Sequence, residues 1–81
     1  MNFKQLVPTY RTRYAHIRQT LRRALAEERV PRMLNIGAGE GDYDPMLLAF
    51  CEHLDSCDIN EEDIEFAMEL NRGRSNLTYS V

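Results

Sequence analysis

The feature that most restricts the fold is a cluster of three glycines in five residues, Gly37, Gly39 and Gly41. Glycine adopts backbone angles that other residues avoid, so this segment is neither regular helix nor regular strand. It follows a short apolar run, residues 33–36, which we interpret as a buried strand. It precedes Asp44 and Pro45, a pair that suits the start of a helix with Asp44 as the N-cap. The sequence therefore predicts a strand, a tight glycine turn and a helix in direct succession.

Helices and strands are predicted to alternate along the rest of the chain. A first helix is expected over about residues 9–28, because apolar residues recur at steps of three and four, at Leu6, Tyr10, Tyr14, Ile17, Leu21 and Leu25. The helix after the glycine turn is expected to reach about residue 53, with a second strand over 54–59. Asn60 is expected to cap a third helix that stops near residues 71–73, and a third strand is expected over 77–81. This alternation favours an α/β fold with a parallel sheet.

Composition excludes several classes of protein. Two cysteines and two histidines in 81 residues provide neither a disulfide framework nor a metal-ligand spacing. No apolar run approaches the roughly 20 residues of a membrane helix, and no secretory signal is recognisable, so we expect a cytoplasmic protein.

Charge is unevenly distributed along the chain. Residues 1–32 hold eight of the ten Lys and Arg residues, whereas residues 33–81 hold eleven of the 13 acids. A basic arm for nucleic acid is one interpretation. We favour a basic helix packed beside an acidic domain, because the arginines are spaced around the helix and do not cluster in a tail.

A carboxylate is expected to lie close to the glycine turn. Asp58 follows the second predicted strand, 17 residues after Gly41. In parallel sheets ligands bind outside the carboxyl ends of the strands, where both features would lie. An ionised carboxylate has two oxygens that accept hydrogen bonds, and these suit the two hydroxyls of a ribose. The combination predicts a nucleoside site.

The type of nucleoside follows from the spacing of the glycines and from charge. The glycines do not match the G-x-G-x-x-G pattern of dinucleotide sites. Glu40, Asp42 and Asp44 crowd the start of the following helix, where they would repel a pyrophosphate but tolerate a sulfonium and an ammonium. Complementing the helix dipole is the alternative role of these acids.

These segments resemble known motifs. Leu34–Gly41 resembles motif I of class I S-adenosylmethionine-dependent methyltransferases, and residues 57–62 resemble their segment with the ribose-binding acid. The resemblance covers about residues 33–81. It implies a three-layer, Rossmann-like half-domain with an extra N-terminal helix, divided into a basic amphipathic helix (1–31) and a βαβαβ cofactor-binding half (32–81).

The resemblance also implies S-adenosyl-L-methionine as cofactor and gives a role to each site residue. The residues implied to line its methionine and ribose portions are Gly37, Ala38, Gly39 and Gly41. Asp58 would hold the ribose hydroxyls, and Ile59 would pack on the adenine. Asn35 stands where many members have Asp or Glu, so it would organise the methionine moiety more weakly or through its amide. Tyr10, Arg13 and Tyr14 are candidates to close over the cofactor, with helix packing as the alternative for the two tyrosines.

The family fold has a larger sheet, and this chain reaches only the third strand. We therefore expect a truncated methyltransferase domain whose methyl acceptor and catalytic base are unidentified. The alternative is a non-catalytic S-adenosylmethionine-binding or scaffolding half-domain that needs a partner chain. The bare edge of the first strand is a site for self-association. Neither a membrane nor nucleic acid is an expected partner.

Overall fold

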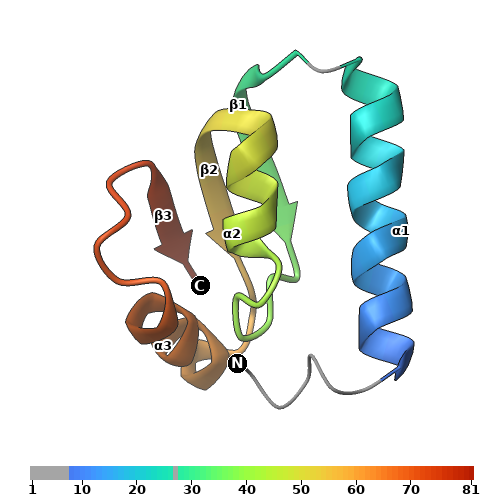
Figure 1. Ribbon diagram of the computed structural model, residues 1–81. Coiled ribbons are helices and arrows are strands. Elements are labelled where there is room, and N and C mark those ends of the chain that lie inside the picture. Colours follow the sequence, from blue (N-terminus) through green and yellow to red (C-terminus); the bar gives the residue numbers. More distant parts are fainter. Residues whose placement is uncertain (1–7, 27) are drawn as a thin grey trace.

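The computed structural model describes residues 8–26 and 28–81, with only the backbone described for residues 8–10 (Figure 1). Its elements in chain order are α1 (Pro8–Leu25), β1 (Val30–Ile36), α2 (Asp44–Leu47), the 3-10 turn η2 (Leu48–Phe50), β2 (Cys51–Cys57), α3 (Glu61–Leu70) and β3 (Leu77–Ser80). The strands form one parallel sheet in the order β1-β2-β3. This confirms the predicted α/β fold, including the additional N-terminal helix.

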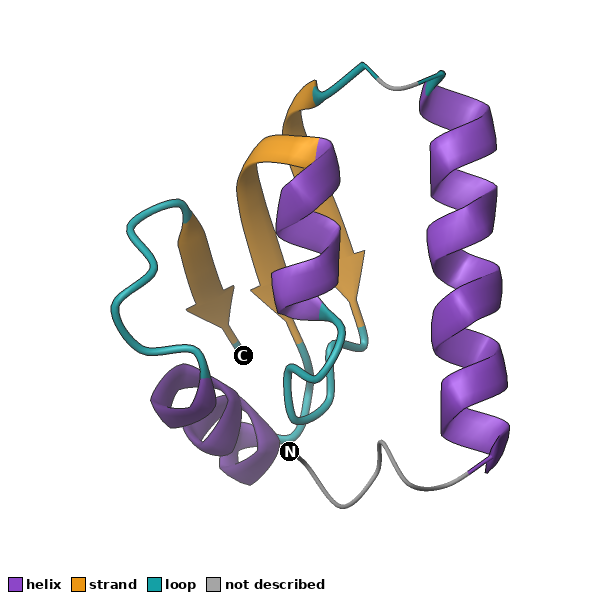
Figure 2. Cartoon of the chain, in the orientation of Figure 1, coloured by secondary structure: helices purple, strands orange, loops and turns teal. Residues whose placement is uncertain are grey.

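The register of the strands divides the sheet into two faces, because successive side chains of a strand point to opposite sides. We call one the covered face, with α2 lying over it (Figure 2); its side chains are Met33, Asn35, Leu54, Ser56, Leu77 and Tyr79. The other is the open face, formed by Arg32, Leu34, Ile36, His53, Asp55, Cys57, Thr78 and Ser80. Leu34 is 61% exposed and Ile36 is 76% exposed, so apolar surface remains on the open face.

The core lies between the covered face and the first two helices. Its buried residues are Met46, Leu47, Leu48, Cys51 and Leu54. Tyr14, Ile17 and Leu21 of α1 pack against them, which confirms this part of the predicted helix face. Leu6 and the side chain of Tyr10 lie outside the described residues. Among the described helices, none is both long enough and apolar enough to cross a bilayer.

The boundary between α2 and β2 differs from the prediction. The helical segment was expected to reach residue 53, but η2 ends at Phe50 and β2 already begins at Cys51. The guanidinium of Arg29 donates to the carbonyl oxygen of Leu48 at 3.3 Å and also to that of Cys51. These bonds satisfy carbonyls that continued helix would otherwise use, and Val30 pairs with Cys51 in the sheet.

Helix α1 is also shorter, and strand β1 is longer, than the sequence predicts. The helix ends at Leu25 because Ala26 adopts a left-handed conformation with φ 48°. Strand β1 begins at Val30 and includes Pro31, which an edge strand accommodates because it has one unpaired side. Self-association through this edge and the division of the chain at residue 31 stay predictions.

Candidate ligand-binding site

The glycine turn is held against the end of β2. Gly37 (φ 75°), Gly39 (φ 59°) and Gly41 (φ 79°) all adopt left-handed conformations that a residue with a Cβ rarely adopts. The backbone N–H groups of Gly37 and Ala38 both donate to the carbonyl oxygen of Cys57, at 2.9 and 3.0 Å. The turn therefore lies at the carboxyl ends of two neighbouring parallel strands.

Asp58 joins the glycine turn to the end of β2, as the sequence predicts. Its Oδ2 accepts from the backbone N–H of Gly39 at 2.9 Å, and its Oδ1 accepts from that of Asn60 at 2.9 Å. These N–H groups, that of Asn60 foremost, hold the pKa of Asp58 below its usual range. Each carboxylate oxygen still has a second lone pair for a ligand hydroxyl.

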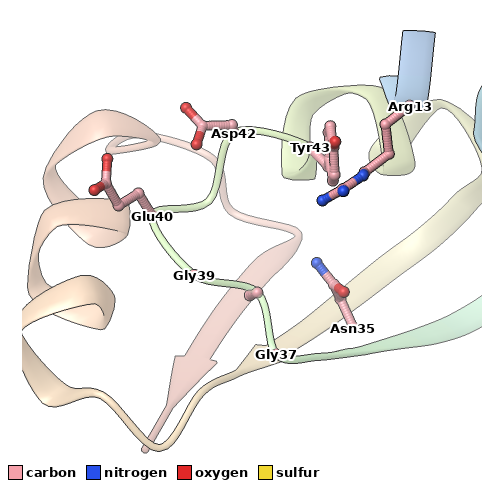
Figure 3. A pocket seen from close by; sticks show the side chains of 8 residues that line it. Arg13, Asn35, Gly37, Gly39, Glu40, Asp42 and Tyr43 are labelled. Carbon is pink, nitrogen blue, oxygen red and sulfur yellow. The ribbon is translucent and has the colours of Figure 1, made fainter. Parts of the chain in front are cut away.

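A cavity of about 300 Å³ lies beside the turn. Its lining residues are Arg13, Asn35, Gly37, Ala38, Gly39, Glu40, Asp42 and Tyr43 (Figure 3). The volume falls at the lower end of the range typical of small-molecule sites. The structure thus brings together four of the predicted site residues with Arg13 of α1, one of the predicted candidates to close over the ligand. It adds Tyr43, whose ring centroid lies 5.9 Å from that of Tyr14.

The other three predicted site residues lie next to this cavity but do not line it. Asp58 is connected to it through Gly39, and Ile59, the next residue, is 97% exposed. Gly41 is buried and faces α3. A Cβ at Gly41 would lie 2.7 Å from the Cβ of Ala67, so packing against α3 requires glycine there. The binding roles assigned to all seven residues stay predictions.

Asp44 is not the N-cap that the sequence predicts. The N-cap is Tyr43, and Asp44 is the first residue of α2, with its side chain fully buried. Its Oδ1 accepts from Asn35 Nδ2 and from Ser56 Oγ, both at 2.9 Å. Its Oδ2 accepts from the hydroxyl of Tyr79 at 2.6 Å. We call this group of four residues the Asp44 hub; it joins all three strands on the covered face.

The hub extends to the end of α3. Asn71 Nδ2 donates to the hydroxyl of Tyr79 at 2.7 Å and to the carbonyl oxygen of Gly41 at 3.0 Å. Burial, together with the bond to Asp44, raises the pKa of Tyr79 far above its usual value. This network is absent from the site that the sequence predicts. Polar residues at inward positions of the three strands could have indicated it, since Asn35, Ser56 and Tyr79 are register partners.

Comparisons with known proteins give structural likeness only. No family model matches the sequence, and no curated protein matches it. The N-methyltransferase NodS of Bradyrhizobium japonicum, solved with S-adenosyl-L-homocysteine, is 24% identical with a TM-score of 0.75, over 96% of this chain and 39% of that one. A second NodS structure is 25% identical with a TM-score of 0.77, over 94% and 41%.

A second methyltransferase is similar over part of its length. The phosphoethanolamine N-methyltransferase 1 of Haemonchus contortus, solved with phosphoethanolamine and S-adenosylhomocysteine, is 26% identical with a TM-score of 0.67, over 90% of this chain and 16% of that one. The present chain spans about two-fifths of the length of NodS. The parallel sheet, the glycine turn and these likenesses agree: the chain has the Rossmann-like fold of class I S-adenosylmethionine-dependent methyltransferases.

Proposed function

We propose that the chain binds S-adenosylmethionine beside the glycine turn and forms the cofactor-binding part of a methyltransferase. The observation that carries this proposal is the 2.9 Å hydrogen bond from the Gly39 N–H to Asp58 Oδ2. It places a close-approach backbone and a carboxylate at one edge of a parallel sheet, where such sheets bind ligands. The methyltransferases with the same fold include structures solved with S-adenosylhomocysteine.

The described residues fit the chemical groups of this cofactor. Asp58 has free lone pairs for the two ribose hydroxyls, and the exposed side chain of Ile59 offers apolar surface for the adenine. Glu40 and Asp42 line the cavity and favour a ligand that carries an ammonium and a sulfonium. Arg13, the cation among the described lining residues, suits the carboxylate of the methionine moiety.

The chemistry of the reaction belongs mainly to the cofactor, which supplies a methyl group bonded to a positively charged sulfur. The residues of this chain bind the cofactor and orient that methyl group. Holding donor and acceptor in line lowers the barrier by about 7–11 kcal/mol in favourable cases. No described residue identifies the methyl acceptor.

Calorimetry tests the proposal directly. S-adenosylmethionine and S-adenosylhomocysteine are expected to bind to the 81-residue chain, whereas NAD, which carries a pyrophosphate, is not. Asp58→Ala should weaken binding about 10- to 100-fold, because hydrogen bonds from the ribose to a charged group are lost. The matched control is Asp55→Asn, which changes a β2 carboxylate on the open face and should leave affinity unchanged. Equal affinity of Asp58→Ala and wild type would refute the ribose assignment.

A further inference from the structure

The Asp44 hub is built around a negative charge inside the protein. Asp44 is fully buried, and three neutral side chains meet it as hydrogen-bond donors, from Asn35, Ser56 and Tyr79. An ionised carboxylate only accepts hydrogen bonds, so three donors match its ionised form. A buried charge is screened by solvent far less than an exposed one. Its field therefore reaches the cavity beside it.

Asn35 lies between this charge and the cavity. Its Nδ2 donates to Asp44 Oδ1 at 2.9 Å, and Asn35 also lines the cavity (Figure 3). Since Asp44 accepts only, the amide must present its nitrogen to the carboxylate. The amide oxygen of Asn35 is thereby left as the acceptor for another partner. An amide oxygen next to a buried carboxylate is a favourable contact for a cation.

We propose that Asp44 helps to position the cationic end of the cofactor, an inference that rests on the proposed function and on the contact with the methionine moiety that the resemblance implies for Asn35. The amide oxygen of Asn35 contacts the ammonium or the sulfonium. Asp44 is a positioning residue: it orients the Asn35 amide and stabilises the positive charge through it. Glu40 and Asp42 contribute less, because both are partly exposed and more strongly screened.

The test compares three ligands by calorimetry: S-adenosylmethionine, S-adenosylhomocysteine and adenosine. Adenosine contains the ribose and the base but no cation. The variant Asp44→Asn removes the charge while keeping the size of the side chain. It should weaken a cationic ligand about tenfold, as expected for losing one buried charge at short range. Adenosine affinity should not change, whereas a merely structural defect would weaken all three ligands.

A double variant separates charge from folding. N35D/D44N keeps one carboxylate and one amide in contact but exchanges their positions. The new amide donates to the new carboxylate, Tyr79 still donates to an oxygen, and the Ser56 hydroxyl turns from donor to acceptor. It should restore the affinity for the cationic ligand to within about threefold of wild type, because the buried charge is retained.

The pattern of losses identifies the contact. A tenfold loss in Asp44→Asn for both S-adenosylmethionine and S-adenosylhomocysteine assigns the pair to the ammonium, and a loss confined to S-adenosylmethionine assigns it to the sulfonium. Unchanged affinities in Asp44→Asn, or no rescue by the double variant, overturn this inference alone. Absence of binding of all three ligands to wild type overturns the proposed function and this inference with it.

Discussion

Two carboxylates join the three strands of the sheet, one on each face, and their surroundings differ sharply. The Asp44 hub on the covered face has a fully buried centre and neutral donors. On the open face Asp55 accepts from Arg32 Nη2 at 2.8 Å and from Thr78 Oγ1 at 2.5 Å, and His53 Nε2 lies 3.2 Å away. We call this second group of four residues the Asp55 hub.

The two hubs connect the same three strands but should differ in how much they stabilise the fold. Each hub uses side chains from β1, β2 and β3, so both have the same reach across the sheet. The Asp55 side chain is 36% exposed and that of Arg32 is 67% exposed, so water and salt compete for their charges. In the Asp44 hub no such competition reaches the carboxylate, and a lost partner leaves a buried polar group without a substitute. The same pattern of bonds should therefore matter much more on the covered face.

The largest expected effect comes from Asp44→Ala. It removes the common acceptor of three donors, and leaving such groups unsatisfied should lower the free energy of unfolding by about 3 kcal/mol or more. Urea unfolding followed by far-UV circular dichroism measures the change. Glu65→Ala, at an exposed position of α3, is the control and should stay within about 0.5 kcal/mol of wild type. Equal effects of the two variants would contradict the importance of the hub.

A smaller loss is expected for Gly41→Ala, which crowds the outer part of the Asp44 hub. The new methyl group would lie 2.9 Å from both Asn71 Nδ2 and the Tyr79 hydroxyl, in addition to its contact with Ala67. Overpacking and the left-handed backbone together should cost about 2 kcal/mol. Gly37→Ala is the matched control, because its φ is also positive but a Cβ there meets no atom within 4 Å. Thermal unfolding should show the larger decrease for Gly41→Ala; a larger decrease for Gly37→Ala would rule out crowding as the cause.

Tyr79→Phe removes one donor from the Asp44 hub and leaves the carboxylate with two. The expected loss in free energy of unfolding is about 1–2 kcal/mol, since a hydrogen bond to a charged group disappears. Asn71 Nδ2 also loses one of its two acceptors. A double-mutant cycle of Tyr79→Phe with Asp44→Ala, which removes the acceptor itself, measures the coupling between the two groups. Strict additivity would show that the bond contributes nothing.

The Asp55 hub should give the smallest effect, and one that depends on pH and salt. The bonds from Thr78 and then Arg32 lower the pKa of Asp55 from its ordinary 3.8 to about 2. A lowered folded-state pKa contributes stability above pH 3.8, and this contribution disappears as the pH falls towards 2. Asp55→Asn should abolish this part of the acid dependence, and 1 M NaCl should weaken it in wild type. A wild-type unfolding midpoint that is unaffected by salt between pH 2 and 5 would contradict a screened, exposed hub.

The sequence predicted correctly those features that depend on residues close together in the chain or at the ends of adjacent strands. Asn60 caps α3 by accepting from the N–H of Asp63 at 3.1 Å, as predicted. The glycine turn and its contact with Asp58 also follow from the sequence, because the turn needs left-handed residues and the strands are parallel. In each case the determining residues lie within one turn or at the ends of adjacent strands.

The predictions that were wrong concern residues whose conformation depends on partners far away in the sequence. Asp is a residue type favoured at N-caps, but the side chain of Asp44 is buried because it accepts hydrogen bonds from residues of all three strands. Residues 51–53 (Cys, Glu and His) contain no local stop signal for the preceding helix, but Arg29 and pairing with β1 place them in β2. Serine is not a typical strand residue, but the hydroxyl of Ser56 donates to Asp44 and so suits this position of β2. Sequence propensity contains no information on such long-range partners.

The alternation of the two hubs along β2 has a consequence for how the strands align during folding. Asp55 and Ser56 are neighbours with opposite orientations, and each must meet its own partners on β1 and β3. A slip of one residue would place the Asp55 carboxylate among apolar core groups and turn Ser56 out to water, so both sets of bonds would fail at once. The two hubs therefore favour the native strand register, because a misaligned sheet loses the hydrogen bonds of both.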